Sequence, residues 1–200
     1  MIKSAWKGRT DMVVYLFNFN TCQDLALLEI GDQQCSPLYS FGPYIRNEYI
    51  FHYVVSGKGV VMLQPSGEKG QNILSETIEV KAGEGFLLEP HTAHMYRADE
   101  NDPWHYIWIV FTGLSVPSYL RACGLTRNNP VFYPQSYAHA VSSRVREPLR
   151  QILGRPDASK AFIIGQLHLF FDGLMENTAV QSKNVTTDIN IANVYIAEAM

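Results

Sequence analysis

The chain has 200 residues, 46% of them hydrophobic, and a formal net charge of −3 at pH 7. This is enough apolar sequence for one sizeable core, and the acidic balance argues against a duplex-binding surface, which requires clustered Lys and Arg. Cys22, Cys35 and Cys123 are scattered and form no CxxC pair, so neither a disulfide framework nor a structural zinc site is expected, and a reducing compartment is favoured.

Short strands are predicted for the segment that ends near residue 114. Its apolar or alternating runs close at turn residues in connectors such as SGKG, PSGEKG and KAGEG. Runs of this length, with Gly-containing connectors and no helical pattern between them, predict antiparallel strands in a sandwich or barrel. The runs are LALLEI, YIFHYVV, VVMLQ, SETIEV, FLLEP and WHYIWIVF.

Helical periodicity replaces this pattern after residue 114. In residues 136–155 and 157–177 the apolar positions recur at spacings of three and four, which predicts two amphipathic helices. Pro148 is expected to kink or delay the first, and Asp157 or Ser159 to cap the second. The apolar face of the second helix is wide, and it either covers the β-structure or pairs with a second subunit.

The last part of the chain has a different character. Residues 178–188 are small, polar and without period, which is typical of a linker, and an amphipathic helix is predicted from residue 189 to the last residue. Neither the N-terminal residues nor the interrupted run at 161–175 has the length of a signal peptide or a membrane span. We therefore predict a cytoplasmic protein with no membrane contact and further chain after the final helix.

Polar aromatic side chains alternate along one predicted strand. Strand periodicity places Trp104, Tyr106 and Trp108 on one face. A buried Tyr or Trp needs a partner for its O–H or N–H group, so three in alternation predict a polar or occupied cavity. Sugars suit such a cavity, because their C–H faces lie on rings while their hydroxyls need fixed donors and acceptors. The opposite face carries His105, Ile107, Ile109 and Phe111.

Three side chains outside this strand are candidates for the polar contacts: Arg46, His94 and Tyr96. The alternative is ordinary packing of the aromatic residues, with Arg46 paired to Glu48 or lying on the surface. The strand periodicity of residues 49–55 also leaves open whether His52 or Tyr53 faces the cavity.

The sequence gives little support for catalysis. There is no HxH pair, no GxSxG motif and no matched carboxylate pair in a strand. We therefore predict neither an enzyme nor a bound metal or other cofactor. The alternative in this class is a metal-dependent cupin enzyme that acts on a sugar or small acid, with ligands drawn from His52, Glu89, His91 and His94.

The segments EYIFHYVVSGKGVVML at 48–63 and KAGEGFLLEPHTAHMYRADENDPWHYIWIVFTG at 81–113 resemble the N-terminal effector-binding and dimerisation domain of AraC-family bacterial transcription regulators. The resemblance rests on the order and spacing of three pieces. They are the strand and turn that contain SGKG, a G-[DE]-x-x-L-x-x-P-x-x-x-H-x-Y run from Gly83 to Tyr96, and a DPW-x-Y-x-W-[IV]-x-F strand from Asp102 to Phe111.

This resemblance implies a mainly β fold: a cupin-like, jelly-roll type antiparallel β-barrel followed by C-terminal α-helices for dimerisation. The implied organisation is an N-terminal arm at 1–20, the ligand-binding barrel at 21–114, a helical dimerisation segment at 115–177, a linker at 178–188, and the start of a truncated helix-turn-helix domain at 189–200.

The implied function is to sense a small carbohydrate effector and form a homodimer. Operator DNA would be bound only through the helix-turn-helix domain that follows this sequence. A purely structural dimerisation module, whose barrel is filled by its own side chains, is a further alternative. The predicted ligand-binding residues are Arg46, His94, Tyr96, Trp104, Tyr106 and Trp108.

Overall fold

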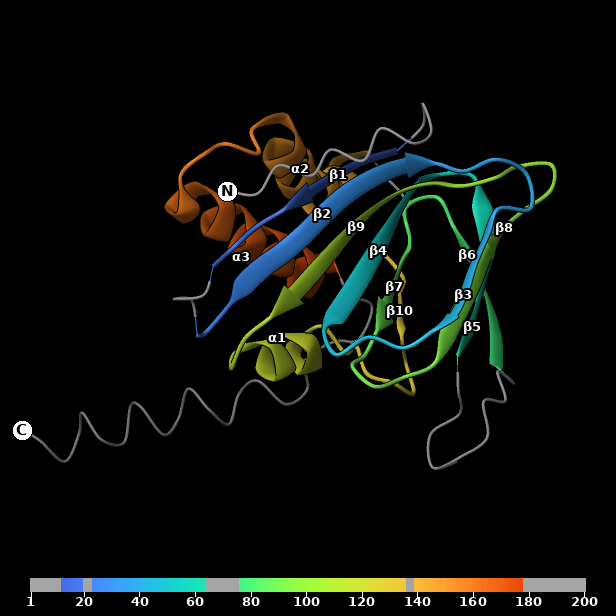
Figure 1. Ribbon diagram of the computed structural model, residues 1–200, viewed down its shortest axis with the longest axis horizontal. Coiled ribbons are helices and arrows are strands. Elements are labelled where there is room, and N and C mark those ends of the chain that lie inside the picture. The colour runs from blue at the N-terminus through green and yellow to red at the C-terminus, as the bar shows by residue number, and fades with distance from the viewer. Residues whose placement is uncertain (1–11, 20–22, 64–75, 136–138, 178–200) are drawn as a thin grey trace, which may run out of the picture.

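The structure is a computed structural model that describes residues 12–19, 23–63, 76–135 and 139–177. Their strands form two antiparallel sheets (Figure 1). The six-stranded sheet has the order β1-β2-β9-β4-β7-β10 and the four-stranded sheet the order β3-β8-β5-β6. The predicted mainly β, antiparallel class of jelly-roll type is confirmed, and the described strands form two hydrogen-bonded sheets rather than one closed barrel.

The strands of the six-stranded sheet, in spatial order, are β1 (Met12–Leu16), β2 (Ala26–Gln34), β9 (His105–Thr112), β4 (Tyr49–Ser56), β7 (Gly85–Leu88) and β10 (Val131–Phe132). Those of the four-stranded sheet are β3 (Ser40–Tyr44), β8 (His94–Ala98), β5 (Lys58–Leu63) and β6 (Glu76–Lys81).

Three helices follow the main run of strands: α1 (Val116–Ala122), α2 (His139–Gly154) and α3 (Lys160–Asn177). Ser159 is the capping residue of α3, since its Oγ accepts a hydrogen bond from the Phe162 N–H at 3.2 Å. No helix in the described part of the chain has the length and apolar character needed to cross a membrane.

Helix α2 continues through Pro148 instead of starting after it. A proline in a helix has no N–H to donate to the carbonyl four residues earlier, which here belongs to Arg144. Gly173 of α3 packs against that carbonyl, and a Cβ at this position would lie only 2.7 Å from the Arg144 oxygen. The two helices therefore approach closely at the point where the proline interrupts the hydrogen bonding of α2.

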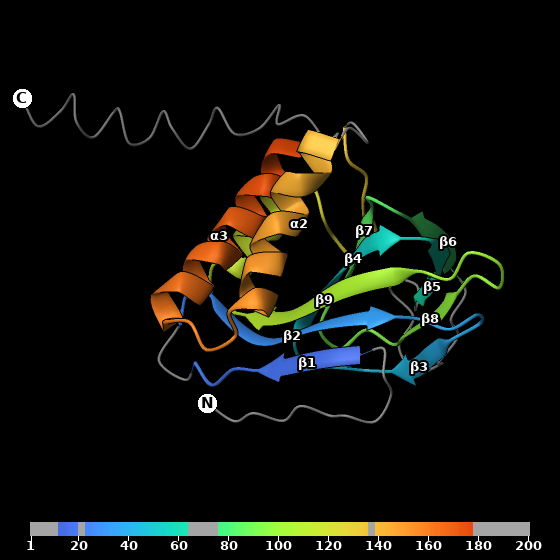
Figure 2. The ribbon, with the colours of Figure 1, turned by 90° about the horizontal axis from the view of Figure 1, so that it is seen from above.

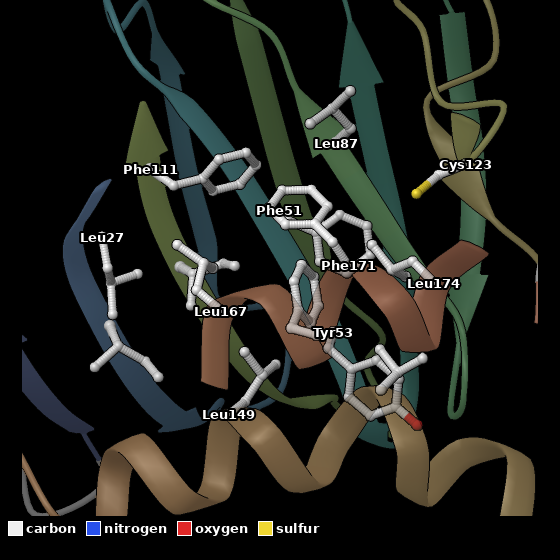
Figure 3. Close-up of a cluster of buried hydrophobic side chains, with 14 of the residues drawn as sticks. Leu27, Phe51, Tyr53, Leu87, Phe111, Cys123, Leu149, Leu167, Phe171 and Leu174 are labelled. Atoms are coloured by element: carbon white, nitrogen blue, oxygen red, sulfur yellow. The ribbon is translucent and has the colours of Figure 1, made fainter. Parts of the chain in front are cut away.

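Helices α2 and α3 cover the outer face of the six-stranded sheet (Figure 2). The core at this face joins sheet and helix side chains, as Figure 3 shows for Phe111, Leu149 and Phe171. The rings of Phe111 and Phe171 meet edge to face at 5.4 Å. The wide apolar face predicted for the second helix thus packs on the β-structure.

A second core lies between the two sheets and is rich in aromatic residues. Strand β9 contributes to both cores, because alternate side chains point to opposite faces. Trp104, Tyr106 and Trp108 belong to the core between the sheets. Ile107, Ile109 and Phe111 belong to the core under the helices. The predicted periodicity of this strand is confirmed.

Some segments differ from the organisation predicted from the sequence. Residues 12–16, in the range assigned to the arm, form the edge strand β1, which pairs with β2. Residues 131–132, in the range assigned to the helical segment, form β10 beside β7. The predicted linker at 178–188 and the start of a helix-turn-helix domain at 189–200 lie outside the described residues.

Candidate functional site

A cavity of about 100 Å³ lies between the two sheets. It brings together five of the six predicted ligand-binding residues: Arg46, His94, Tyr96, Tyr106 and Trp108. The rest of its lining comes from both sheets and from the loops beside β3. These further lining residues are Met12, Glu29, Gln33, Tyr39, Phe41, Ile50, His52 and Val110.

Trp104, the sixth predicted residue, does not line the cavity. Its side chain is fully buried behind the wall, where its ring stacks on Phe86 at 5.8 Å and meets the edges of Tyr96 and Tyr106. It precedes the first residue of β9 and so lies at a different position along the strand direction from Trp108. Its contacts support the rings of the wall.

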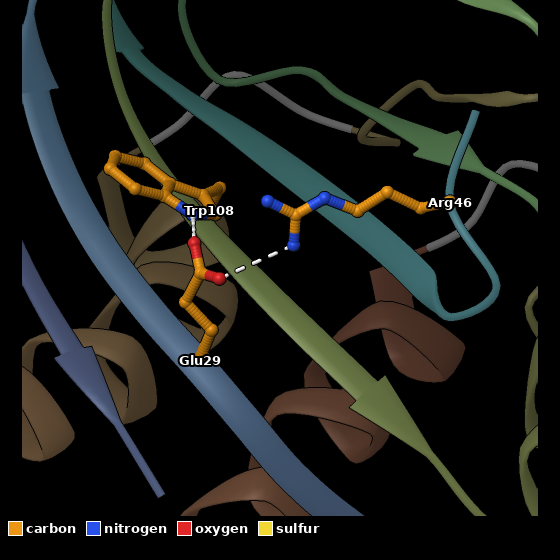
Figure 4. Close-up of polar contacts among 3 residues, drawn as sticks. All are labelled: Glu29, Arg46 and Trp108. Atoms are coloured by element: carbon orange, nitrogen blue, oxygen red, sulfur yellow. Dashed lines mark hydrogen bonds and ion pairs between the residues drawn. The ribbon is translucent and has the colours of Figure 1, made fainter. Parts of the chain in front are cut away.

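Glu29 on β2 connects two of the predicted residues (Figure 4). Trp108 donates its Nε1–H to Glu29 Oε1 at 2.7 Å, and Arg46 Nη1 donates to Glu29 Oε2 at 3.2 Å. Arg46 is thus paired with Glu29, and not with its sequence neighbour Glu48. One carboxylate fixes both the indole and the guanidinium at the wall of the cavity.

The position of the Trp108 indole depends on a glycine. Gly31 lies directly opposite Trp108 in the register of β2 and β9. A Cβ at Gly31 would lie 2.1 Å from Cζ2 of the indole, far inside contact distance. The indole therefore lies across the backbone of β2, and this places its N–H within reach of Glu29.

The strand periodicity of β2 alone does not identify Glu29 as a residue of the cavity. The register between β2 and β9 shifts between Leu27 and Glu29. A bulge of this kind adds a residue to one strand and changes which face the following side chains occupy. Leu27 accordingly packs under the helices, while Glu29 lines the cavity. The sequence carries no turn signal at this point.

Two buried histidines line the cavity without satisfying their hydrogen-bonding capacity. His94 Nδ1 bonds the Thr92 carbonyl at 3.1 Å, but His94 Nε2 and His52 Nδ1 have no partner within the described part of the chain. Burial is the main cause that lowers the pKa of both imidazoles, that of His52 to well below its usual range. Both rings are therefore neutral at pH 7, each with a nitrogen free to donate or accept a hydrogen bond.

The orientation of His52 settles a question that the sequence left open. The His52 ring stacks on Phe86 at 4.5 Å and lines the cavity. Tyr53, the next residue, lies on the opposite face of β4, in the core under the helices (Figure 3).

Tyrosine hydroxyls form another part of the wall. Tyr106 donates its O–H to Gln33 Oε1 at 3.0 Å, and Tyr96 stacks on Phe41 at 5.3 Å. Burial is the largest cause that raises the pKa of both tyrosines, so their hydroxyls remain protonated donors at all physiological pH values. The wall thus combines rings with uncharged donors and acceptors.

The ligand set considered for a metal-dependent cupin enzyme does not come together. His52 and His94 line the cavity, but Glu89 and His91 do not. His91 is exposed at a turn, with φ of 59° and its N–H donated to the Arg46 carbonyl. Among the described residues, no three His, Cys, Asp or Glu side chains converge on one point.

The Cys35 thiol, which lies near the cavity, is not ionised, because burial raises its pKa to about 12.

Two antiparallel sheets that enclose a polar aromatic cavity, with helices on the outer face of one sheet, define a β-sheet ligand-binding domain. Residues 28–169 match the family model of the AraC-like ligand binding domain, and the chain belongs to this family.

Two relatives of the chain are operon regulators. The Msm operon regulatory protein of Streptococcus mutans is 28% identical over 155 residues, which cover 76% of this chain and 51% of that protein. The raffinose operon transcriptional regulatory protein RafR of Pediococcus pentosaceus is 33% identical over 87 residues, which cover 43% of this chain and 28% of that protein. The chain thus spans about half, or less, of the length of these relatives.

Among solved structures, a cupin superfamily protein from Desulfitobacterium hafniense is similar with a TM-score of 0.34 and 7% identity, over 50% of this chain and 77% of that one.

Proposed function

We propose that this chain is the effector-sensing domain of a transcription regulator, and that its effector is a small carbohydrate. The observation that carries the proposal is a pair of buried imidazole nitrogens without a partner, on His52 and His94, two residues that line the cavity. Buried polar atoms are nearly always hydrogen-bonded, so a partner is expected to enter the cavity. A ligand with hydroxyl groups can donate to one nitrogen or accept from it, whichever tautomer each ring adopts.

The remainder of the wall suits the same chemistry. The Trp108 indole offers an apolar surface, and Tyr106 and Tyr96 offer hydroxyls next to rings. Sugars bind on such surfaces because they have both C–H faces and hydroxyl groups. Among the described residues of the lining, only Glu29 and Arg46 carry a formal charge, and they form a pair, so an uncharged effector suits the cavity better than a charged one.

The relatives support a carbohydrate, since RafR is named after a raffinose operon and a further relative is named the lactose operon transcription activator of Staphylococcus xylosus. The relatives are named as regulators or activators, which supports a binding function. Because the relatives are regulators, we assign operator binding to a domain outside this sequence. We further propose that the helices form the homodimer contact and that the protein acts in the cytoplasm. Within the described part of the chain, Cys35 and Cys123 form no disulfide, which supports a reducing compartment.

The test is a melting-temperature screen of the 200-residue chain against mono- and oligosaccharides, repeated with Trp108→Ala. A ligand at about 100 times its Kd stabilises the native state by about 2.7 kcal/mol, which in a chain of this size is about 5–10 °C. We expect one sugar to produce such a shift, Trp108→Ala to abolish it while remaining folded, and Leu114→Ala, a change at an exposed residue, to retain it. If no sugar shifts the melting temperature of the parent chain, the proposal is wrong.

A further inference from the structure

An exposed aromatic side chain, that of Tyr44, lies beside the mouth of the cavity but is not one of the residues that line it. Tyr44 ends β3, and the loop from β3 to β4 continues through Ile45 to Arg46, which reaches the cavity. Tyr44 is 49% exposed and Ile45 is 50% exposed. The loop thus presents two large apolar side chains to solvent immediately beside a residue of the cavity wall.

The Tyr44 ring is held by groups of that wall. It lies opposite His94 in the register of β3 and β8, and meets the edge of the His94 ring at 6.4 Å. It also meets Phe41 at 5.8 Å, and Phe41 in turn stacks on Tyr96 inside the cavity. The Arg46 guanidinium carbon lies 5.9 Å from the centre of the Tyr44 ring. A continuous row of rings therefore runs from the interior of the cavity to its outer edge.

The size of the cavity limits what can be enclosed. Pockets for drug-sized ligands have volumes of about 300–1,000 Å³, whereas the free volume here is about 100 Å³. A single sugar ring is therefore the most that the two sheets can enclose. Any further ring of a longer saccharide has to leave through the mouth and pass along the loop that carries Tyr44.

We propose that Tyr44 is the platform of a second sugar subsite, so that the effector is a di- or oligosaccharide with its terminal ring in the cavity and its next ring on Tyr44. The inference rests on the proposed function. Its chemistry is that of the inner site: a preorganised ring that is wet on one side accepts the C–H face of a sugar, and the adjacent Arg46 supplies hydrogen-bond donors for its hydroxyls. Because Tyr44 is already held in place, binding there orders few further groups.

The test compares saccharides that grow by one ring at a time. Titration calorimetry on the 200-residue chain measures Kd for glucose, maltose and maltotriose, and for galactose, melibiose and raffinose. We expect the disaccharide of one series to bind more tightly than its monosaccharide. Tyr44→Ala is expected to weaken the disaccharide by about five- to tenfold and the monosaccharide by less than about twofold. Tyr44→Phe retains the ring, so it is expected to keep most of the tighter binding of the disaccharide relative to the monosaccharide.

Tyr133 provides the matched control, since it is exposed to a similar extent, 46%, and does not line the cavity. Tyr133→Ala is expected to leave every Kd unchanged. Equal binding of mono- and disaccharides by the parent chain would refute the second subsite and leave the proposed function intact. So would an equal loss of both in Tyr44→Ala. If none of the six sugars binds, this proposal falls together with the carbohydrate assignment.

Discussion

Replacing Glu29 is the sharpest test of how the cavity wall is held together. Glu29 accepts one hydrogen bond from Trp108 Nε1 at 2.7 Å and one from Arg46 at 3.2 Å. Hydrogen bonds to a charged group contribute about 1.5–3 kcal/mol, and this range applies to the Trp108 bond. The ion pair with Arg46 contributes less, at most about 1 kcal/mol, because the two side chains are 31% and 16% exposed and solvent screens them.

Glu29→Ala is therefore expected to lower the free energy of unfolding by about 2–3 kcal/mol. This corresponds to a loss of about 4–12 °C in melting temperature for a chain of this size. Glu29→Gln retains an amide oxygen that can accept the indole N–H but loses the charge, so about 1 kcal/mol is expected. Urea unfolding followed by tryptophan fluorescence measures both values, and the indole emission of Trp108 is expected to change in Glu29→Ala.

The control is Glu79→Ala, which removes an exposed glutamate from β6 and is expected to change stability by less than about 0.5 kcal/mol. The reasoning fails if Glu29→Ala and Glu79→Ala lose the same amount. It also fails if Glu29→Gln is as damaging as Glu29→Ala, because the stabilisation then does not come from the hydrogen bond to Trp108.

Three further changes follow from the packing and the ionisation of buried groups. Gly31→Ala places a methyl group where the Trp108 indole lies, so we expect a loss of about 1–3 kcal/mol and a shifted tryptophan emission; an unchanged spectrum would contradict this. Burial holds the pKa of His52 and His94 below the unfolded value near 6.5, so the unfolded state binds more protons in acid. The free energy of unfolding is then at its full value above about pH 6.5 and falls below it, by up to about 1.4 kcal/mol per pH unit for each histidine. In His52→Phe, the urea concentration at the midpoint of unfolding should therefore change less between pH 5 and pH 7 than in the parent chain. Leu149→Ala, at a fully buried position of α2, is expected to lower unfolding free energy by about 2–5 kcal/mol, and the exposed neighbour Arg150→Ala by less than about 0.5, as calorimetry would show.

The parts of the fold that follow a regular period were predictable from the sequence. The alternation in β9 assigned Trp108 to one face and Phe111 to the other because strand side chains alternate strictly. Asp157 and Ser159 before an apolar run placed the start of α3 to within a few residues, and the structure selects Ser159 as the cap. By contrast, the two residues of β10 are too few to show a period, and the MVVYL run of β1 has β-prone residues but does not reveal that it pairs with β2.

In the candidate site, too, the residues that follow a regular period were predictable, and those that depend on the pairing of strands were not. Tyr106 and Tyr96 were found from alternation and family motif together, and the structure brings them to one cavity. Glu29 was missed because a register shift, which depends on pairing with β9, decides the face it occupies. Trp104 was placed on the correct face, but depth along the strand direction decides contact with the cavity, and periodicity contains no information on depth. The choice between His52 and Tyr53 likewise needed the register of β4 against β9.

The cavity wall is built from two kinds of positions that differ in how freely they can change. Strand β9 lies in the interior of its sheet and packs on both faces, so a substitution at Trp108 lowers stability as well as recognition, although the chain is expected to remain folded. Tyr44 ends β3, Ile45 follows it in the exposed loop, and Met12 belongs to an edge strand, so changes at these positions are expected to reshape the mouth with little effect on stability. Natural or laboratory evolution of this domain toward a different effector is therefore expected to proceed first through the mouth, while β9 remains fixed.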